Sequence, residues 1–173
     1  YTVRLALVRA QAANLTERYG QTPLIVPMVP VRHSDGTPHE EGLRKLREMI
    51  SHRLQFARTD SDQAFSSPAE VDRLCDASGG HLRLLMTLVQ TTCAQARGLP
   101  LTAAHIESAV RQVGAQPRLQ ARDYATALQQ VAATHQIVGL PPDIRQALLH
   151  HRLIYEYCSD GDYWYDVAPL LQR

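Results

Sequence analysis

Two adjacent glycines followed by an arginine form the stretch of this sequence best suited to binding chemistry. Gly79 and Gly80 interrupt a helical pattern, and Arg83 falls on the first turn of the helix that restarts after them. Glycines let a ligand approach the backbone, and a helix start offers unpaired N–H groups and a positive dipole end. The planar guanidinium of arginine suits phosphate oxygens. On these residues alone, two interpretations stay open. One is a tight corner between two helices with a solvated arginine, which the residues by themselves favour, and the other is a contact with an anionic group such as a phosphate.

The common catalytic and metal-binding motifs are missing from the 173 residues. The sequence has no GxxxxGK[ST], no HExxH and no GxSxG. His150 and His151 are neighbours that would point about 100° apart on a helix, which makes a poor metal pair. The three cysteines, Cys75, Cys93 and Cys158, form no CxxC pair and indicate a reducing compartment. We expect no catalytic residue, no metal site and no enzymatic activity of the isolated chain.

Composition narrows the classes of partner. The formal net charge of +1 argues against a protein that relies on bulk electrostatic attraction to nucleic acid or to a membrane. No apolar run approaches the roughly 20 residues that span a bilayer, and no signal peptide opens the chain. The sequence does not begin with Met. We expect a cytoplasmic location and a chain that is a piece of a longer protein.

The first third of the chain predicts helices around one strand. Residues 2–19 have an apolar spacing typical of a helix, with Val3, Leu7, Ala10 and Leu15 on one face. The run PLIVPMVPV at 23–31 predicts a strand whose prolines lie at an end or edge. A turn over 32–38 leads to a helix over 40–56.

The middle of the chain predicts a compact three-helix module. Ser67 to Glu70 form a capping-box pattern that starts a helix over 68–77. The next helix ends at Gly98, and a third runs from Thr102 to 113 with Gly114 behind it. The inward face predicted for the second helix is Leu82, Leu85, Met86, Val89, Cys93 and Ala96. Arg83 should emerge beside that face.

The end of the chain predicts two helices and a hairpin. After a linker over 114–118, helices are expected over 120–135 and from Pro142, followed by aromatic strands around Ser159–Asp162. Five basic and six acidic residues lie from Ala115 to Arg173, and the hairpin carries Glu156, Asp160, Asp162 and Asp166. This balance is unfavourable for phosphate contacts. We expect the hairpin to pack against its own helices or a partner protein, with DNA binding through stacked aromatics as the alternative.

The segment 43–113 resembles the end of the nucleotide-binding domain and the helical lid of AAA+ ATPases, in the origin-initiator-like and STAND-type branches. GLRKLREMISHRL (42–54) looks like the helix after the last core strand, and SGGHLRLLMTLVQTTCAQARG (78–98) looks like the lid segment that carries the sensor 2 arginine. LTAAHIESAV (101–110) looks like the last lid helix. Arg83 is the position that matches sensor 2. The acidic, aromatic hairpin departs from replication initiators and looks more like the terminal element of prokaryotic P-loop ATPases that gate other domains.

The resemblance implies a mainly α fold: a helical lid bundle plus a winged-helix-like unit with a C-terminal β-hairpin, preceded by one strand and helices from the end of an α/β core. The implied domains are 1–58 (end of the core), 59–114 (lid) and 115–173 (winged-helix-like unit). The implied cofactor is ATP in the parent protein, with magnesium bound by the missing core, and Arg83, Gly79 and Gly80 as the nucleotide-contacting residues.

The implied partners are the rest of the ATPase core, a protein partner or effector domain, and further copies in a homo-oligomer, with DNA less favoured and no membrane. Two other functions stay open. The terminal helix–helix–hairpin unit would bind DNA in one of them, and in the other the chain is a helical protein–protein adaptor without a nucleotide site.

Overall fold

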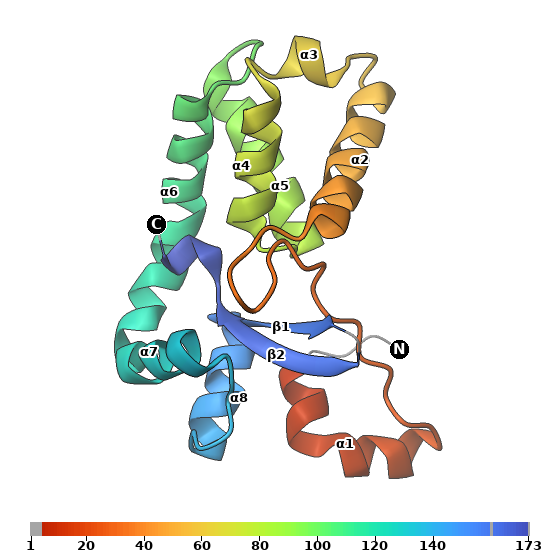
Figure 1. Cartoon of the computed structure of the whole chain (residues 1–173), viewed down its shortest axis with the longest axis vertical. Coiled ribbons are helices and arrows are strands. Elements are labelled where there is room, and N and C mark those ends of the chain that lie inside the picture. Colours follow the sequence, from red (N-terminus) through yellow and green to blue (C-terminus); the bar gives the residue numbers. More distant parts are fainter. Residues whose placement is uncertain (1–4, 160, 173) are drawn as a thin grey trace. The chain divides into compact units, whose positions relative to one another are not determined.

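The computed structural model describes residues 5–159 and 161–172, and the chain divides into two compact units (Figure 1). Unit 1 comprises Tyr1–Pro27 and Leu119–Ala168, and unit 2 comprises Met28–Arg118 and Pro169–Arg173. The protein is mainly helical and ends in a two-stranded antiparallel hairpin, as the sequence predicts.

Unit 2 is a helical bundle built around α4. Its elements are α2 (Glu40–Phe56), α3 (Ser61–Ala64), α4 (Pro68–Ser78), α5 (Leu82–Ala96), α6 (Ala103–Ala121) and the 3₁₀ turn η2 (Pro169–Leu171). Helix α4 packs against α2, α5 and η2 (Figure 1). The centre of the core consists of fully buried aliphatic side chains, namely Leu46, Ile50, Leu74, Leu85, Leu88, Leu101 and Ile106. The helix over 40–56 and the junction of two helices at Gly79–Gly80 are confirmed.

The buried face of α5 differs from the predicted one. Leu85 is buried as expected, but Leu82 and Cys93 are exposed, whereas Leu88 and Thr92 lie in the core. Thr92 tolerates burial because its hydroxyl donates to the Leu88 carbonyl at 2.7 Å. The sequence prediction missed Thr92 because it assigned only apolar residues to the buried face.

The predicted helix stop at Gly114 and linker over 114–118 are wrong, because α6 continues to Ala121 with Pro117 inside it. The Arg118 guanidinium donates to the Arg111 carbonyl at 2.9 Å and to the Leu170 carbonyl at 2.8 Å. A β-carbon at Gly114 would lie 2.7 Å from that guanidinium. Gly114 thus makes room for Arg118 on the helix surface and does not end the helix.

The predicted strand over 23–31 is also wrong. Within the described residues this segment has no ladder partner, and the nearest pairing is an isolated bridge between Arg32 and Pro38. Its three prolines cannot donate to a ladder, which favours an extended segment without a sheet. Leu24 and Val26 are 90% and 83% exposed, so the apolar run does not mark a buried strand.

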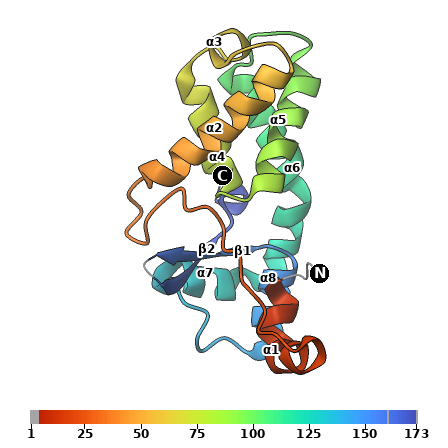
Figure 2. The same cartoon turned by 90° about the vertical axis from the view of Figure 1, so that its right-hand side faces the viewer.

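Unit 1 joins the first helix to the end of the chain. Its elements are α1 (Leu5–Tyr19), the 3₁₀ turn η1 (Arg122–Tyr124), α7 (Ala125–Thr134), α8 (Pro142–His150), β1 (Ile154–Ser159) and β2 (Asp162–Val167). Helix α1 packs against α8, and α7 packs against β2 (Figure 2). The helix predicted over 120–135 begins later, at Ala125, because α6 and η1 occupy its first turns.

The face predicted for α1 is wrong in its described part. Ala6 and Val8 are buried and Leu7 is exposed; Val3 lies outside the described residues. Gln11 has non-helical dihedral angles (φ −138°, ψ 31°), so α1 is kinked and a single stripe of constant period does not describe it.

In the hairpin, the register begins with the pair Ile154 and Val167 and ends with the pair Ser159 and Asp162. Asp160, in the turn, lies outside the described residues. Tyr157 stacks on Trp164, and the His135 ring meets Trp164 edge-on. Tyr155, Tyr157, Trp164 and Tyr165 are buried, whereas Tyr163 is 41% exposed. Most of the aromatic residues of the hairpin thus pack within their own unit.

Glu156 is not the surface charge that the sequence suggests. Its side chain is 0% exposed and accepts two hydrogen bonds from Arg9 of α1, each 2.8 Å long. The Tyr165 hydroxyl donates to the same carboxylate at 2.6 Å. Pairing and hydrogen bonding offset the cost of burying this charge, and they fix α1 on the hairpin.

The division expected from the resemblance, 1–58, 59–114 and 115–173, stays a prediction about domain origin. The packing gives a different grouping. The resemblance assigns α2 to the nucleotide-binding domain, but in the structure α2 shares one hydrophobic core with α4 and α5.

Candidate functional site

The predicted anion-contacting residues lie at the corner between α4 and α5. Gly79 adopts the left-handed conformation (φ 56°) and Gly80 has φ 77°, so the chain reverses within two residues. The buried Ser78 hydroxyl accepts from the Gly80 amide at 3.1 Å and donates to the Cys75 carbonyl at 2.7 Å. The corner is therefore a closed hydrogen-bonded turn.

The backbone of the segment before α2 fits tightly against this corner. A β-carbon at Gly80 would lie 1.7 Å from the Val29 carbonyl oxygen, and one at Gly42 would lie 1.8 Å from the Pro30 carbonyl oxygen. Two consecutive carbonyl groups thus contact glycines on two different elements. This contact explains the glycine at position 80 by packing, without any ligand.

Arg83 lies on the first turn of α5, and its side chain is exposed. Its guanidinium has no hydrogen bond or ion pair with any residue that the structure describes. The start of α5 is capped by His81, whose Nδ1 accepts from the Leu84 amide at 3.1 Å. The His81 carbonyl accepts from the Leu85 amide at 2.9 Å. The exposed Arg83 cation thus lies next to the capped start of α5, at the positive end of the helix dipole.

Neighbouring charges are already paired. Asp76, on the last turns of α4, meets Arg32 at 3.5 Å, and Arg32 also donates to the Gly36 carbonyl. This pair ties the loop over 32–38 to α4. Because Asp76 has this partner, it does not neutralise Arg83.

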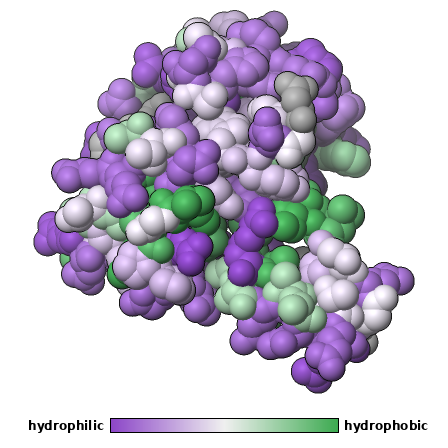
Figure 3. Space-filling view, turned by 60° about the horizontal axis from the view of Figure 1, so that its bottom comes forward, coloured by the Kyte–Doolittle hydropathy of each residue, from purple (hydrophilic) through white to green (hydrophobic). Residues whose placement is uncertain are grey.

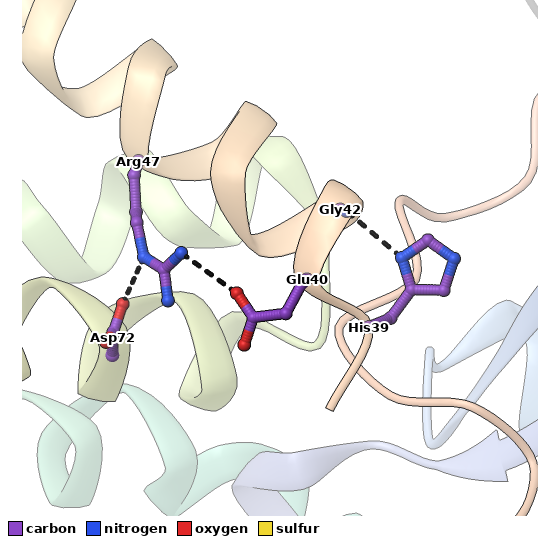
Figure 4. Close-up of polar contacts among 5 residues, drawn as sticks. All are labelled: His39, Glu40, Gly42, Arg47 and Asp72. Atoms are coloured by element: carbon purple, nitrogen blue, oxygen red, sulfur yellow. Dashed lines mark hydrogen bonds and ion pairs between the residues drawn. The ribbon is translucent and has the colours of Figure 1, made fainter. Parts of the chain in front are cut away.

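A second polar cluster fixes the start of α2 (Figure 4). His39 caps the helix, with its Nδ1 accepting from the Gly42 amide at 3.0 Å. Arg47 donates to Asp72 of α4 at 2.6 Å and lies 3.4 Å from Glu40. The hydrogen bond to Asp72 is the main cause that raises the pKa of Arg47. Sequence reasoning missed this cluster, because the 25-residue separation of Arg47 and Asp72 leaves no local signal.

The geometry brings Gly79, Gly80 and Arg83 together at one corner, as the sequence predicts. The arrangement fits a phosphate group, since the Arg83 side chain is exposed beside a helix start. In the described part of the chain, no group of three or more His, Cys, Asp or Glu side chains could hold a metal ion. Within residues 5–159 and 161–172, no helix combines the length and apolar composition needed to cross a bilayer.

No protein-family model, characterised protein or solved structure matches this chain.

Proposed function

We propose that the chain is the C-terminal part of an AAA+/STAND-like ATPase and that Arg83 senses the nucleotide and relays its state. The observation that supports this most is the exposed Arg83 guanidinium at the corner of α4 and α5, without a hydrogen bond or ion pair among the described residues. An exposed cation beside a helix start is available to an anionic group outside the chain.

The cofactor would be ATP, and Arg83 would contact its γ-phosphate with Gly79 and Gly80 shaping the approach. The sequence has no GxxxxGK[ST] motif, so the phosphate cradle and the magnesium ligands must come from other residues of the parent protein. This chain supplies binding and orientation, and the bound nucleotide supplies the phosphate whose presence is read.

A route for the relay follows from the contacts of the corner. Displacement of Arg83 moves the start of α5 and therefore Gly80, whose backbone touches the Val29 carbonyl. Val29 lies two residues beyond Pro27, where the chain passes from unit 1 to unit 2. The corner thus acts on the segment that connects the two units, and unit 1 would be the winged-helix-like effector end.

The test is the Arg83→Ala variant of the full-length natural protein. A charge-assisted contact made only with the γ-phosphate should weaken ATP binding about 10- to 150-fold and leave ADP binding nearly unchanged. Arg53→Ala is the matched control, because Arg53 is an exposed arginine of α2 in the same unit. Equal losses for ATP and ADP would indicate a general anion contact, and no loss would refute the sensor.

The adaptor alternative gains from one observation, the lack of a sheet strand over 23–31 among the described residues. An adaptor would bind its protein partner with the same affinity in ATP, in ADP and without nucleotide. Nucleotide-dependent partner binding that Arg83→Ala abolishes would exclude it.

A further inference from the structure

Unit 1 contains a pocket of about 690 Å³ that lies between α1, the loop before α8, α8 itself and β2. This volume is within the range of ordinary small-molecule sites, roughly 300–1,000 Å³. The pocket does not involve the corner at Gly79–Gly80, so its role is independent of the proposed nucleotide contact.

Arg9 forms one wall and is held rigidly. Its Nε and Nη2 groups each donate one hydrogen bond to the Glu156 carboxylate. The guanidinium carbon lies 5.1 Å from the centroid of the Tyr163 ring. A guanidinium has five N–H donors, so donors remain for the pocket. The side chain is 34% exposed, which leaves it accessible to a ligand.

Arg145 forms a second, uncompensated cationic wall. It lies on α8, is half-buried, and its guanidinium has no hydrogen bond or ion pair within residues 5–159 and 161–172. None of the described lining residues is acidic. Since Glu156 offsets Arg9, the pocket keeps the positive charge of Arg145.

The remaining walls are apolar or aromatic. Ile137, Val138 and Leu149 line the pocket together with the rings of Tyr163 and Tyr165. Val138 is 77% exposed, so its side chain is accessible to the apolar part of a ligand. Figure 3, in which the lower end of Figure 1 comes forward, shows green apolar areas beside purple polar ones on this face.

We propose that this pocket binds a small organic carboxylate, whose anionic group pairs with Arg145 and the free edge of Arg9 and whose apolar body covers Ile137 and Val138. The arginine fork favours a planar carboxylate, and the volume of about 690 Å³ is that of a small-molecule site. Unit 1 would then have an input of its own, separate from the nucleotide.

The test is a titration of the ¹⁵N-labelled full chain with phenylacetate, followed by amide chemical shifts. We expect a Kd of about 1 mM, typical of a ligand with so few atoms, with shifts at Val138, Arg145 and Tyr163. The neutral probe phenylacetamide should bind about tenfold or more weakly, because it lacks the charge-assisted contact.

Three variants separate the pocket from unspecific binding. Arg145→Gln should reduce phenylacetate affinity about tenfold or more, and Ala10→Trp should block the pocket from α1. Arg122→Gln, at an exposed arginine of the same unit outside the pocket, should bind as the unmodified chain does. Equal shifts from phenylacetate and phenylacetamide, or undiminished binding by Arg145→Gln, would overturn the proposal.

Discussion

Three glycines of unit 2 separate the two physical reasons for which glycine is needed. Gly36 has φ 84° and open space around its Cα, whereas Gly42 is helical but touches the Pro30 carbonyl. Gly80 combines both constraints: its φ is 77°, and the Val29 carbonyl occupies the space that a β-carbon would need. The same substitution at the three positions therefore measures backbone strain alone at Gly36, steric clash alone at Gly42, and both together at Gly80.

We predict that alanine at these positions destabilises unit 2 in the order Gly36, Gly42, Gly80. Gly36→Ala costs about 1 to 2 kcal/mol for the left-handed backbone alone. Gly42→Ala costs about 1 to 3 kcal/mol or more, because a backbone carbonyl has to move. Gly80→Ala should cost about the sum, and Gly80→Val more still. Urea denaturation followed by circular dichroism measures the order, and a Gly80 variant as stable as Gly36→Ala would show that Val29 does not press on the corner.

The cysteines of unit 2 offer a second test at the residue scale. Cys75 is buried, and burial raises the pKa of its thiol to about 12. Cys93 is exposed on α5, although partial desolvation also raises its pKa. A raised pKa lowers the thiolate fraction at pH 8, and only the thiolate reacts readily.

We therefore expect iodoacetamide at pH 8 to alkylate Cys93 well before Cys75 in the folded chain. Peptide mass spectrometry gives both rates, and the denatured chain is the control in which the two should react alike. Equal rates in the folded chain would mean that the core around Cys75 opens easily.

At the scale of elements, the sequence predicted what depends on local pattern. The helix over 40–56 has a regular apolar spacing and two acidic residues in its first turn, and it forms with those bounds. The α4–α5 corner follows from two adjacent glycines. Arg83 could be placed for the same reason, since its position depends only on where α5 begins.

The sequence predictions are wrong mainly where contacts between residues far apart in the chain determine the structure. Helix α6 continues past Gly114, and Arg118 in the added turns donates to the Leu170 carbonyl, 52 residues away. Glu156 is buried because Arg9, 147 residues away, reaches it. The segment over 23–31 has strand-like composition, but its prolines leave it without a ladder. The pocket of unit 1 could not be predicted for the same reason, since α1 and α8 contribute to it from opposite ends of the chain.

The contact between α1 and the hairpin predicts a strong and specific mutational effect. Arg9→Met leaves Glu156 buried without its cation and should destabilise unit 1 by about 3 to 5 kcal/mol. The double variant Arg9→Met with Glu156→Gln should recover much of this loss, because the uncompensated charge is gone while Tyr165 keeps an acceptor. Arg18→Met, at an exposed position of α1, is the control.

The fluorescence of Trp164 during urea unfolding measures these effects. It is the single tryptophan of the chain, and it stacks on Tyr157 inside unit 1. A double variant as unstable as Arg9→Met would mean that lost packing, and not the buried charge, causes the effect.

At the scale of the whole molecule, the two units differ in secondary structure, because unit 2 is helical and unit 1 combines helices with the β-hairpin. Unit 2 holds its own hydrophobic core of helices, and unit 1 holds the hairpin and the Trp164 cluster. The chain crosses between them at 27/28, 118/119 and 168/169, the second of these inside α6. Units that bury separate cores can unfold separately.

We predict two unfolding transitions that two variants shift independently. Gly80→Ala, in unit 2, should lower the midpoint of one circular dichroism transition and leave the Trp164 fluorescence midpoint unchanged. Arg9→Met, in unit 1, should lower the fluorescence midpoint and leave the other transition in place. The unmodified chain, measured with both signals in the same urea series, provides the reference. If each variant moves both signals together, the two units unfold as one cooperative domain, and the separate transitions predicted here are excluded.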